Sequence, residues 1–192
     1  ISAPTTRNPT MSPTMSPTTA DRTPSPTSTD SPIPAPTIIF ATYDSVLGAP
    51  RCIDAGSSCS SGAELINGKQ AADFGSNTEP NSSHNTVDTC VDGPGGRYHY
   101  DESIDAITVA AIGGGQLQEG GLAEIQATVY SWNTGAADTA DFYYASDATS
   151  PIWVFAGSVK SPNGGLQTLS VEYTVPAGID QVVRVNFRYA GS

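Results

Sequence analysis

Proline density in the first 37 residues is the feature that most restricts what this chain can fold into. Nine prolines, ten threonines and six serines fall in that segment, which also contains two consecutive Met-Ser-Pro-Thr repeats at 11–14 and 15–18. Each proline lacks a backbone N–H and has a fixed φ, so neither a helix nor a central strand is available. We therefore expect residues 1–37 to form an extended, polyproline II-like stalk.

Serine- and threonine-rich segments with proline are typical of O-glycosylated stalks. A plain disordered linker has the same composition, and this alternative stays open. Asn81 begins an Asn-Ser-Ser sequon, which adds one N-glycosylation site. We expect covalent glycans on Asn81 and on the stalk threonines Thr5, Thr6, Thr10, Thr14, Thr18, Thr19, Thr23, Thr27 and Thr29.

From residue 38 onward, short alternating apolar and polar runs are separated by Gly, Asn, Asp and Pro, and no long run has helical spacing. This pattern predicts an all-β fold, with one β-sandwich or jelly-roll-like domain over residues 38–192. The seven expected strands are Ile38–Asp44, Ile104–Ile112, Leu122–Trp132, Ala140–Ala145, Ile152–Val159, Leu166–Val175 and Gln181–Tyr189.

The long loop expected over residues 49–100 contains all three cysteines, Cys52, Cys59 and Cys90. No Cys-x-x-Cys motif accompanies them, so we expect a disulfide formed in an oxidising, extracellular setting instead of a zinc site. We favour the pair Cys59–Cys90, which would staple the loop, and Cys52–Cys59 is the open alternative. A protein of this kind would be secreted.

The densest acidic cluster is Asp101-Glu102-Ser103-Ile104-Asp105, and Asp92 begins a glycine-rich stretch just before it. Calcium prefers several oxygen ligands at once, from carboxylates and loop carbonyls. We therefore predict a Ca²⁺ site formed by Asp92, Asp101, Glu102 and Asp105. A solvated acidic surface would give the same pattern, and the spacing does not match an EF-hand.

Charge and hydropathy exclude two classes of partner. The chain has 8 Lys+Arg against 19 Asp+Glu, for a formal net charge of −11, which argues against a nucleic-acid partner. No apolar run approaches the roughly 20 residues needed for a membrane span. The chain opens at Ile1 without the features of a signal peptide, so any targeting segment is expected to be gone already.

Candidate catalytic residues are few. The chain has no G-x-S-x-G nucleophile elbow, and His84 and His99 both stand in polar, loop-like sequence. Paired carboxylates for glycoside hydrolysis would have to face a common cleft, which the sequence does not indicate. We expect the protein not to be an enzyme.

Several stretches resemble a β-sandwich repeat found in large secreted proteins: Ala41–Asp44, Leu47–Cys52, Tyr98–Asp105 and Ala140–Ala145. That resemblance covers residues 41–190 and implies a domain of the kind that often accompanies peptidases as a non-catalytic appendage or stands in tandem arrays. The combination of stalk and single domain also resembles the protomers of extracellular glycosylated fibrils. This second resemblance implies head-to-tail assembly with copies of the same chain.

The segment Ile38, Ile39 and Phe40 is the most apolar piece next to the stalk. The pattern favours it as the first strand of its own domain, and we also consider it as the assembly segment, because an extended segment can complete the sheet edge of a neighbour. We therefore predict a structural subunit of a glycan-coated extracellular filament. The alternative is a stalked carbohydrate-binding or adhesion module, calcium-dependent, that uses the aromatic side chains of Tyr130, Trp132, Tyr143 and Trp153.

Overall fold

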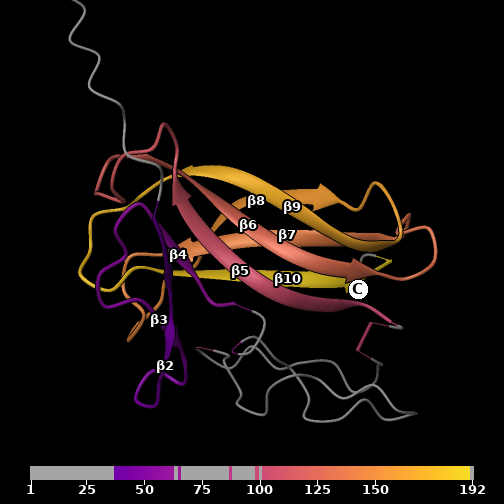
Figure 1. Cartoon of the computed structure of the whole chain (residues 1–192), viewed down its shortest axis with the longest axis horizontal. Coiled ribbons are helices and arrows are strands. Elements are labelled where there is room, and N and C mark those ends of the chain that lie inside the picture. Colours follow the sequence, from indigo (N-terminus) through magenta and orange to yellow (C-terminus); the bar gives the residue numbers. More distant parts are fainter. Residues whose placement is uncertain (1–36, 63–64, 66–86, 88–97, 100, 191–192) are drawn as a thin grey trace, which may run out of the picture. The chain divides into compact units, whose positions relative to one another are not determined.

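The computed structural model describes residues 37–62, 65, 87, 98–99 and 101–190 (Figure 1). The chain divides into two units, residues 1–32 and 33–192, and the first lies wholly outside the described residues. The expected stalk over 1–37 therefore falls almost entirely outside them, as do all the threonines predicted to carry glycans. All the strands described belong to the second unit.

Every regular element of the described residues is a β-strand, so the predicted all-β class is confirmed. Five strands form sheet A in the order β1-β4-β5-β6-β9, three form sheet C in the order β10-β7-β8, and β2 and β3 pair as a hairpin. The strands are β1 (Ile38–Phe40), β2 (Thr42–Asp44), β3 (Ala49–Arg51), β4 (Ser58–Ser60), β5 (Ser103–Ala111), β6 (Leu122–Ser131), β7 (Asp138–Ala145), β8 (Val154–Lys160), β9 (Gly165–Thr174) and β10 (Val182–Tyr189).

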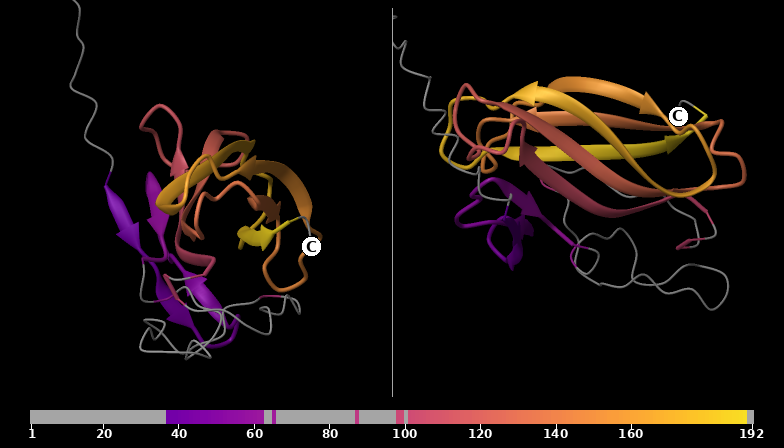
Figure 2. Two further views of the ribbon diagram at one scale, coloured as in Figure 1. Left: turned by 90° about the vertical axis from the view of Figure 1, so that its right-hand side faces the viewer. Right: turned by 45° about the horizontal axis from the view of Figure 1, so that its top comes forward.

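Sheets A and C pack face to face around one apolar core, the arrangement of a β-sandwich (Figure 2). Strand β6 shows why the sequence folds this way. Its odd-numbered residues Ala123, Ile125, Ala127 and Val129 are 0% exposed, because alternate side chains of a strand point to the same face. From sheet C, the fully buried Phe142 of β7 joins the same core.

The two sheets approach each other closely where β8 meets β9. A Cβ atom added at Gly157 of β8 would lie 3.1 Å from Cγ1 of Val171 on β9, so the absence of a side chain at this position allows the close approach. Both strands are edges of their own sheets. The tight contact therefore covers one side of the sandwich without main-chain pairing between the sheets.

The predicted strands agree with β5 to β10 to within a few residues, whereas the N-terminal part differs. The expected strand over residues 38–44 is two strands, because Ala41 is buried and the chain changes sheets there, from sheet A to the hairpin. Strands β3 and β4 lie inside the predicted loop. Their sequences, Ala-Pro-Arg and Ser-Cys-Ser, have no apolar alternation that would have indicated them.

Candidate functional site

The first candidate site is the edge of sheet A formed by β1, the predicted assembly segment. β1 pairs in parallel with β4, and Ile38 and Phe40 lie opposite Ser58 and Ser60. The pairing continues where the amide of Ala41 donates to the Ser60 carbonyl at 2.8 Å. Ile38–Phe40 is thus the first strand of its own domain.

Side-chain contacts of β1 are sparse. Ile38 is 56% exposed and Phe40 is 68% exposed, so two of the three side chains contribute little buried surface. The middle residue, Ile39, lies against Gly56, where an added Cβ would be 3.6 Å from its Cγ1. The ring of Phe40 lies beside Gly62 in the same way, where an added Cβ would be 3.7 Å from its Cδ1. Strand β1 is therefore held mainly by main-chain hydrogen bonds and by the contacts of Ile39 and Phe40 with these two glycines.

One disulfide lies behind this edge, and it joins Cys52 to Cys59. The favoured prediction, Cys59–Cys90, is wrong, and the alternative is the pair that forms; Cys90 lies outside the described residues. A tight turn explains the outcome. Gly56 has a φ of 53°, its amide donates to Oδ1 of Asp54, and the chain returns at once as β4, which places the two cysteines across the turn.

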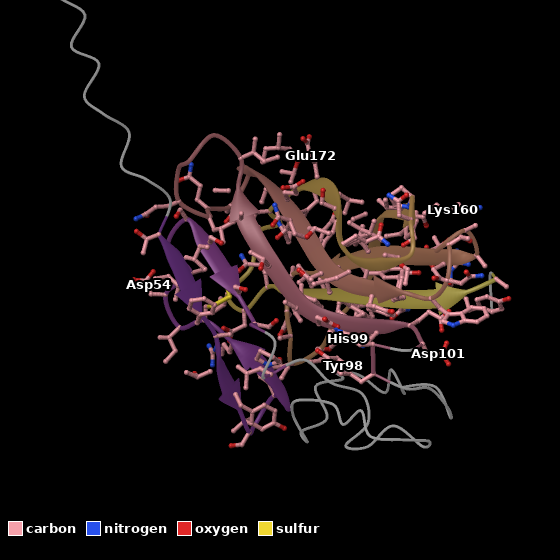
Figure 3. All side chains as sticks on the ribbon, turned by 45° about the vertical axis from the view of Figure 1, so that its right-hand side comes forward. Asp54, Tyr98, His99, Asp101, Lys160 and Glu172 are labelled. Atoms are coloured by element: carbon pink, nitrogen blue, oxygen red, sulfur yellow. A yellow bond between two sulfur atoms is a disulfide. The ribbon has the colours of Figure 1, made fainter. Side chains whose placement is uncertain are left out.

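The second candidate site is the acidic cluster before and at the start of β5. Asp105 is only 7% exposed, and its two carboxylate oxygens already have partners. Nε2 of His99 lies 2.5 Å from one oxygen, and the Ser103 hydroxyl donates to the other at 2.8 Å. The ring of His99 is also stacked on Tyr98 and Tyr130, and Figure 3 shows Tyr98 and His99 side by side below β5.

This Ser-His-Asp combination does not have the geometry of a hydrolase triad. A triad needs the base hydrogen-bonded to the nucleophile, with the acid on the far side of the histidine. Here the hydroxyl of Ser103 and the ring of His99 both contact Asp105, so the carboxylate lies between them. The group instead fixes residue 99 against the entry to β5.

Glu102 turns to a partner that the sequence did not indicate, Asp138 at the start of β7. The side chains of Glu102 and Asp138 are hydrogen-bonded, and Asp101 lies beside Glu102. Burial, followed by the hydrogen bond and charge of Asp101, raises the pKa of Glu102 to about 8. Burial also raises the pKa of Asp138, which is 1% exposed and whose Oδ2 has no hydrogen-bond partner.

The predicted calcium ligands are therefore not brought together as a set. Asp105 faces His99 and Ser103, Asp101 and Glu102 approach Asp138, and Asp92 lies outside the described residues. Within the described part of the chain, no group of three or more His, Cys, Asp or Glu side chains could hold a metal ion. Calcium binding stays a prediction.

The third candidate site is the face of sheet C that points away from the core. Two of the predicted sugar-binding aromatics, Tyr143 and Trp153, lie here, joined by Phe155, which the sequence pattern did not indicate. Tyr143 and Phe155 meet edge to face with ring centroids 5.4 Å apart, and the Arg184 guanidinium lies 3.9 Å above the Trp153 ring. Cross-strand register brings them together, because Tyr143 is opposite both Phe155 and Arg184.

The other two aromatics lie elsewhere. Tyr130 on β6 is stacked with His99, and Trp132 is 48% exposed just after β6 ends. The remaining acidic side chains near β7 are also separated: Arg188 and Ser158 hydrogen-bond Asp141 and lower the pKa of its carboxyl, whereas Thr149 hydrogen-bonds Asp147. No carboxylate pair of the glycosidase kind is formed between these two residues.

Comparisons with known proteins returned no match: no family model fits the chain, and no curated protein or solved structure is significantly similar. No helix among the described residues is both long and apolar enough to cross a membrane. Asn81, the predicted N-glycosylation site, lies outside the described residues.

Proposed function

We propose that this protein is a structural subunit of an extracellular, glycan-coated filament, in which the N-terminal segment of one copy docks on the β-domain of the next. The observation that supports it is that few side-chain contacts hold β1 in place. This strand follows directly on the proline-rich segment, lies at the edge of sheet A, and leaves Ile38 and Phe40 more than half exposed. The same three residues of a neighbouring copy would make the same contacts.

Exchange of an edge strand costs little free energy, because each bond lost within one copy is regained between copies. The path of the described polypeptide is compatible with a linear array of subunits. Strand β1 lies beside the last residues of β5, because Ile38 is opposite Ser58 and Ser58 is opposite Ala110. Strand β10 finishes at the other end of the sandwich, where β5 and β9 begin (Figure 1). Subunits linked through β1 would then form a linear array.

Electron microscopy of the full-length chain tests this proposal, with Ile39→Asp as the decisive variant. Asp at position 39 would bury a charge against Gly56 and prevent docking of β1, so filaments should form with the unmodified chain and be lost with the variant. Leu122→Asp, at a residue that is 48% exposed on β6, is the matched control and should retain them. Single particles from the unmodified chain under all conditions would refute the proposal.

One observation favours a second candidate function, a carbohydrate-binding module on a stalk. Tyr143, Trp153 and Phe155 gather on the outer face of sheet C, and aromatic faces are where sugar rings stack. A glycan array probed with the full-length chain, with and without calcium, tests this candidate. Binding that is lost in Phe155→Ala would support it, and silence of the array in both conditions would count against it.

A further inference from the structure

The outer face of sheet C combines aromatic and cationic side chains. In β10, Val185 points to the core, so Arg184 and Arg188 point outward, and in β8 Lys160 lies in the same cross-strand row as Arg188. We call this surface the basic face, defined by Tyr143, Trp153, Phe155, Lys160, Arg184 and Arg188. An outward face of an antiparallel sheet is ordinarily polar, so the exposed Phe155 is unexpected here.

The charge of this face is opposite to that of the molecule. The described residues contain four basic side chains, and three of them belong to the basic face; the fourth, Arg51, is paired with Asp44 and Asp180. The same residues contain twelve carboxylic side chains. Of these only Asp141 occupies a strand position on the basic face, where Arg188 pairs with it at 2.5 Å.

The arrangement of the rings argues for a protein partner over a sugar. A sugar-binding platform needs aromatic faces that are open and roughly coplanar. The guanidinium of Arg184 lies 3.9 Å above the Trp153 ring, and the rings of Tyr143 and Phe155 are inclined by 60°. The Arg184 guanidinium also donates a hydrogen bond to the Val87 carbonyl. The accessible part of the basic face is therefore Phe155, which is 56% exposed, together with the exposed Lys160 and the partly exposed Arg188. This combination suits an acidic protein surface.

A complementary surface lies on the outer face of sheet A. Glu124 of β6 and Glu172 of β9 are directly opposite each other in the antiparallel register. Like charges in this position are destabilising within one copy, so a cationic surface docked over them would relieve the repulsion. Figure 3 shows Glu172 and Lys160 at separate points on the surface. We call the pair Glu124 and Glu172 the acidic row.

We propose that the basic face of one copy docks on the acidic row of a second copy. Because the two surfaces differ, the contact is heterologous, and in the proposed filament it repeats from copy to copy with a rotation that does not close a ring. This inference rests on the proposed filament and names a second contact in it, beside the exchange of β1.

The size of the basic face indicates a contact that is weak alone. Three strands of about seven residues cover roughly 14 by 23 Å, on the order of 300 Å². A stable interface buries about 800 Å² on each partner. The contact would therefore depend on the link through β1, which raises the effective concentration of the neighbouring domain.

Charge reversal in the full-length chain tests the inference, with association followed by sedimentation velocity in roughly 50 mM and 500 mM NaCl. The unmodified chain should associate in low salt and dissociate at least in part in high salt, because exposed charges are screened. The double variants Lys160→Glu/Arg184→Glu and Glu124→Lys/Glu172→Lys should each associate at least about tenfold more weakly. An equimolar mixture of the two should regain association, since each then supplies the surface that the other lacks.

Glu119→Lys is the control, because it makes one Glu-to-Lys reversal at an exposed position outside both surfaces and should leave association unchanged. Thermal unfolding of each variant checks that the fold is kept. Association that survives both reversals, a mixture that fails to recover, or binding of the basic face to a neutral polysaccharide would overturn the inference. If filaments persist in both charge-reversed variants, only the inference about the second contact is overturned and the proposed function stands. If the unmodified chain forms no filaments, the proposed function itself is refuted.

Discussion

Strands β6 and β1 belong to the same sheet, yet they are fixed in different ways. β6 has ten residues, is paired on both sides, and places four fully buried side chains in the core. β1 has three residues, is paired on one side, and leaves two of its side chains more than half exposed. One strand is specified by packing, and the other is held by main-chain bonds.

This difference means that β6 stabilises the domain, whereas β1 is available for assembly. Removing β6 would destroy the core, whereas removing β1 would expose one edge of β4 and little apolar surface. An unpaired edge is a template for another chain. Substitutions in the two strands, and at the disulfide and the carboxyl pair, should therefore differ widely in their effect on stability.

Ile125→Ala in β6 should have the largest effect. The side chain is 0% exposed in the core, so its truncation removes buried methyl groups and leaves a cavity. We expect the free energy of unfolding to fall by about 3 kcal/mol. Urea denaturation followed by circular dichroism measures this quantity, and a loss below about 1 kcal/mol would mean that β6 is not central to stability.

The double variant Cys52→Ser/Cys59→Ser should have the next largest effect. The disulfide closes a loop with a sequence separation of 7, and loop closure of that length stabilises by about 2.5 kcal/mol on the chain-entropy model. Since Cys59 lies in β4, the amides of β1 should also exchange hydrogen faster in the variant. Unchanged stability and unchanged exchange would show that the disulfide does not support this edge.

Glu102→Gln tests the carboxyl pair that joins the entry of β5 to β7. The folded-state pKa of Glu102 is raised to about 8, so its contribution to stability is full below the ordinary pKa of 4.5 and is lost as the pH rises towards 8. Asp141 has a lowered pKa, so its contribution to stability is lost as the pH falls, and this loss occurs only in more acidic solution. Measurements between about pH 5 and pH 9 therefore isolate the pair.

With a neutral amide at position 102, the decline in stability over this pH range should become shallower. At about pH 9 the variant should be more stable than the unmodified chain by about 1 kcal/mol, a figure reduced for the partial exposure of the side chain. Chemical denaturation across the pH range gives both curves. Parallel curves for the two proteins would mean that Glu102 is not the titrating group.

Substitutions within β1 should have the smallest effects on stability. Ile39→Ala removes the contact with Gly56 and should cost about 1 kcal/mol, less than Ile125→Ala, because the side chain is only partly buried. Ile38→Ala, at a position that is 56% exposed, should change stability by less than about 0.5 kcal/mol. Equal losses at positions 39 and 125 would remove the distinction between the two strands.

The sequence was most informative where one face of a strand is buried. Alternation over residues 166–175 and 181–189 predicted β9 and β10 well, because burial of one face imposes a period of two. β3 and β4 could not be predicted in this way. They are three residues long, and β4 buries two serines, Ser58 and Ser60, which carry no apolar signal.

Site residues were harder to predict, because their partners are distant in sequence. Asp101, Glu102 and Asp105 were grouped by proximity along the chain, yet the carboxylate of Asp105 turns to His99 and that of Glu102 to Asp138. For a related reason the sequence favoured Cys59–Cys90 and gave Cys52–Cys59, the pair that forms, only as the alternative. The turn at Gly56 brings Cys52 and Cys59 together, and a glycine between two closely spaced cysteines is the sequence signal for such a turn.

The most direct test of the central claim is to ask whether β1 pairs with β4 of its own chain or of another. A photo-cross-linking amino acid replaces the exposed Phe40, which lies opposite Ser60, and equal amounts of ¹⁴N- and ¹⁵N-labelled chains are unfolded and refolded together with the disulfide intact. Mass spectrometry of the cross-linked peptides then identifies the partner. Exchange of β1 predicts that about half of the cross-links join chains of different label, whereas cross-links found only between segments of the same label would contradict the account.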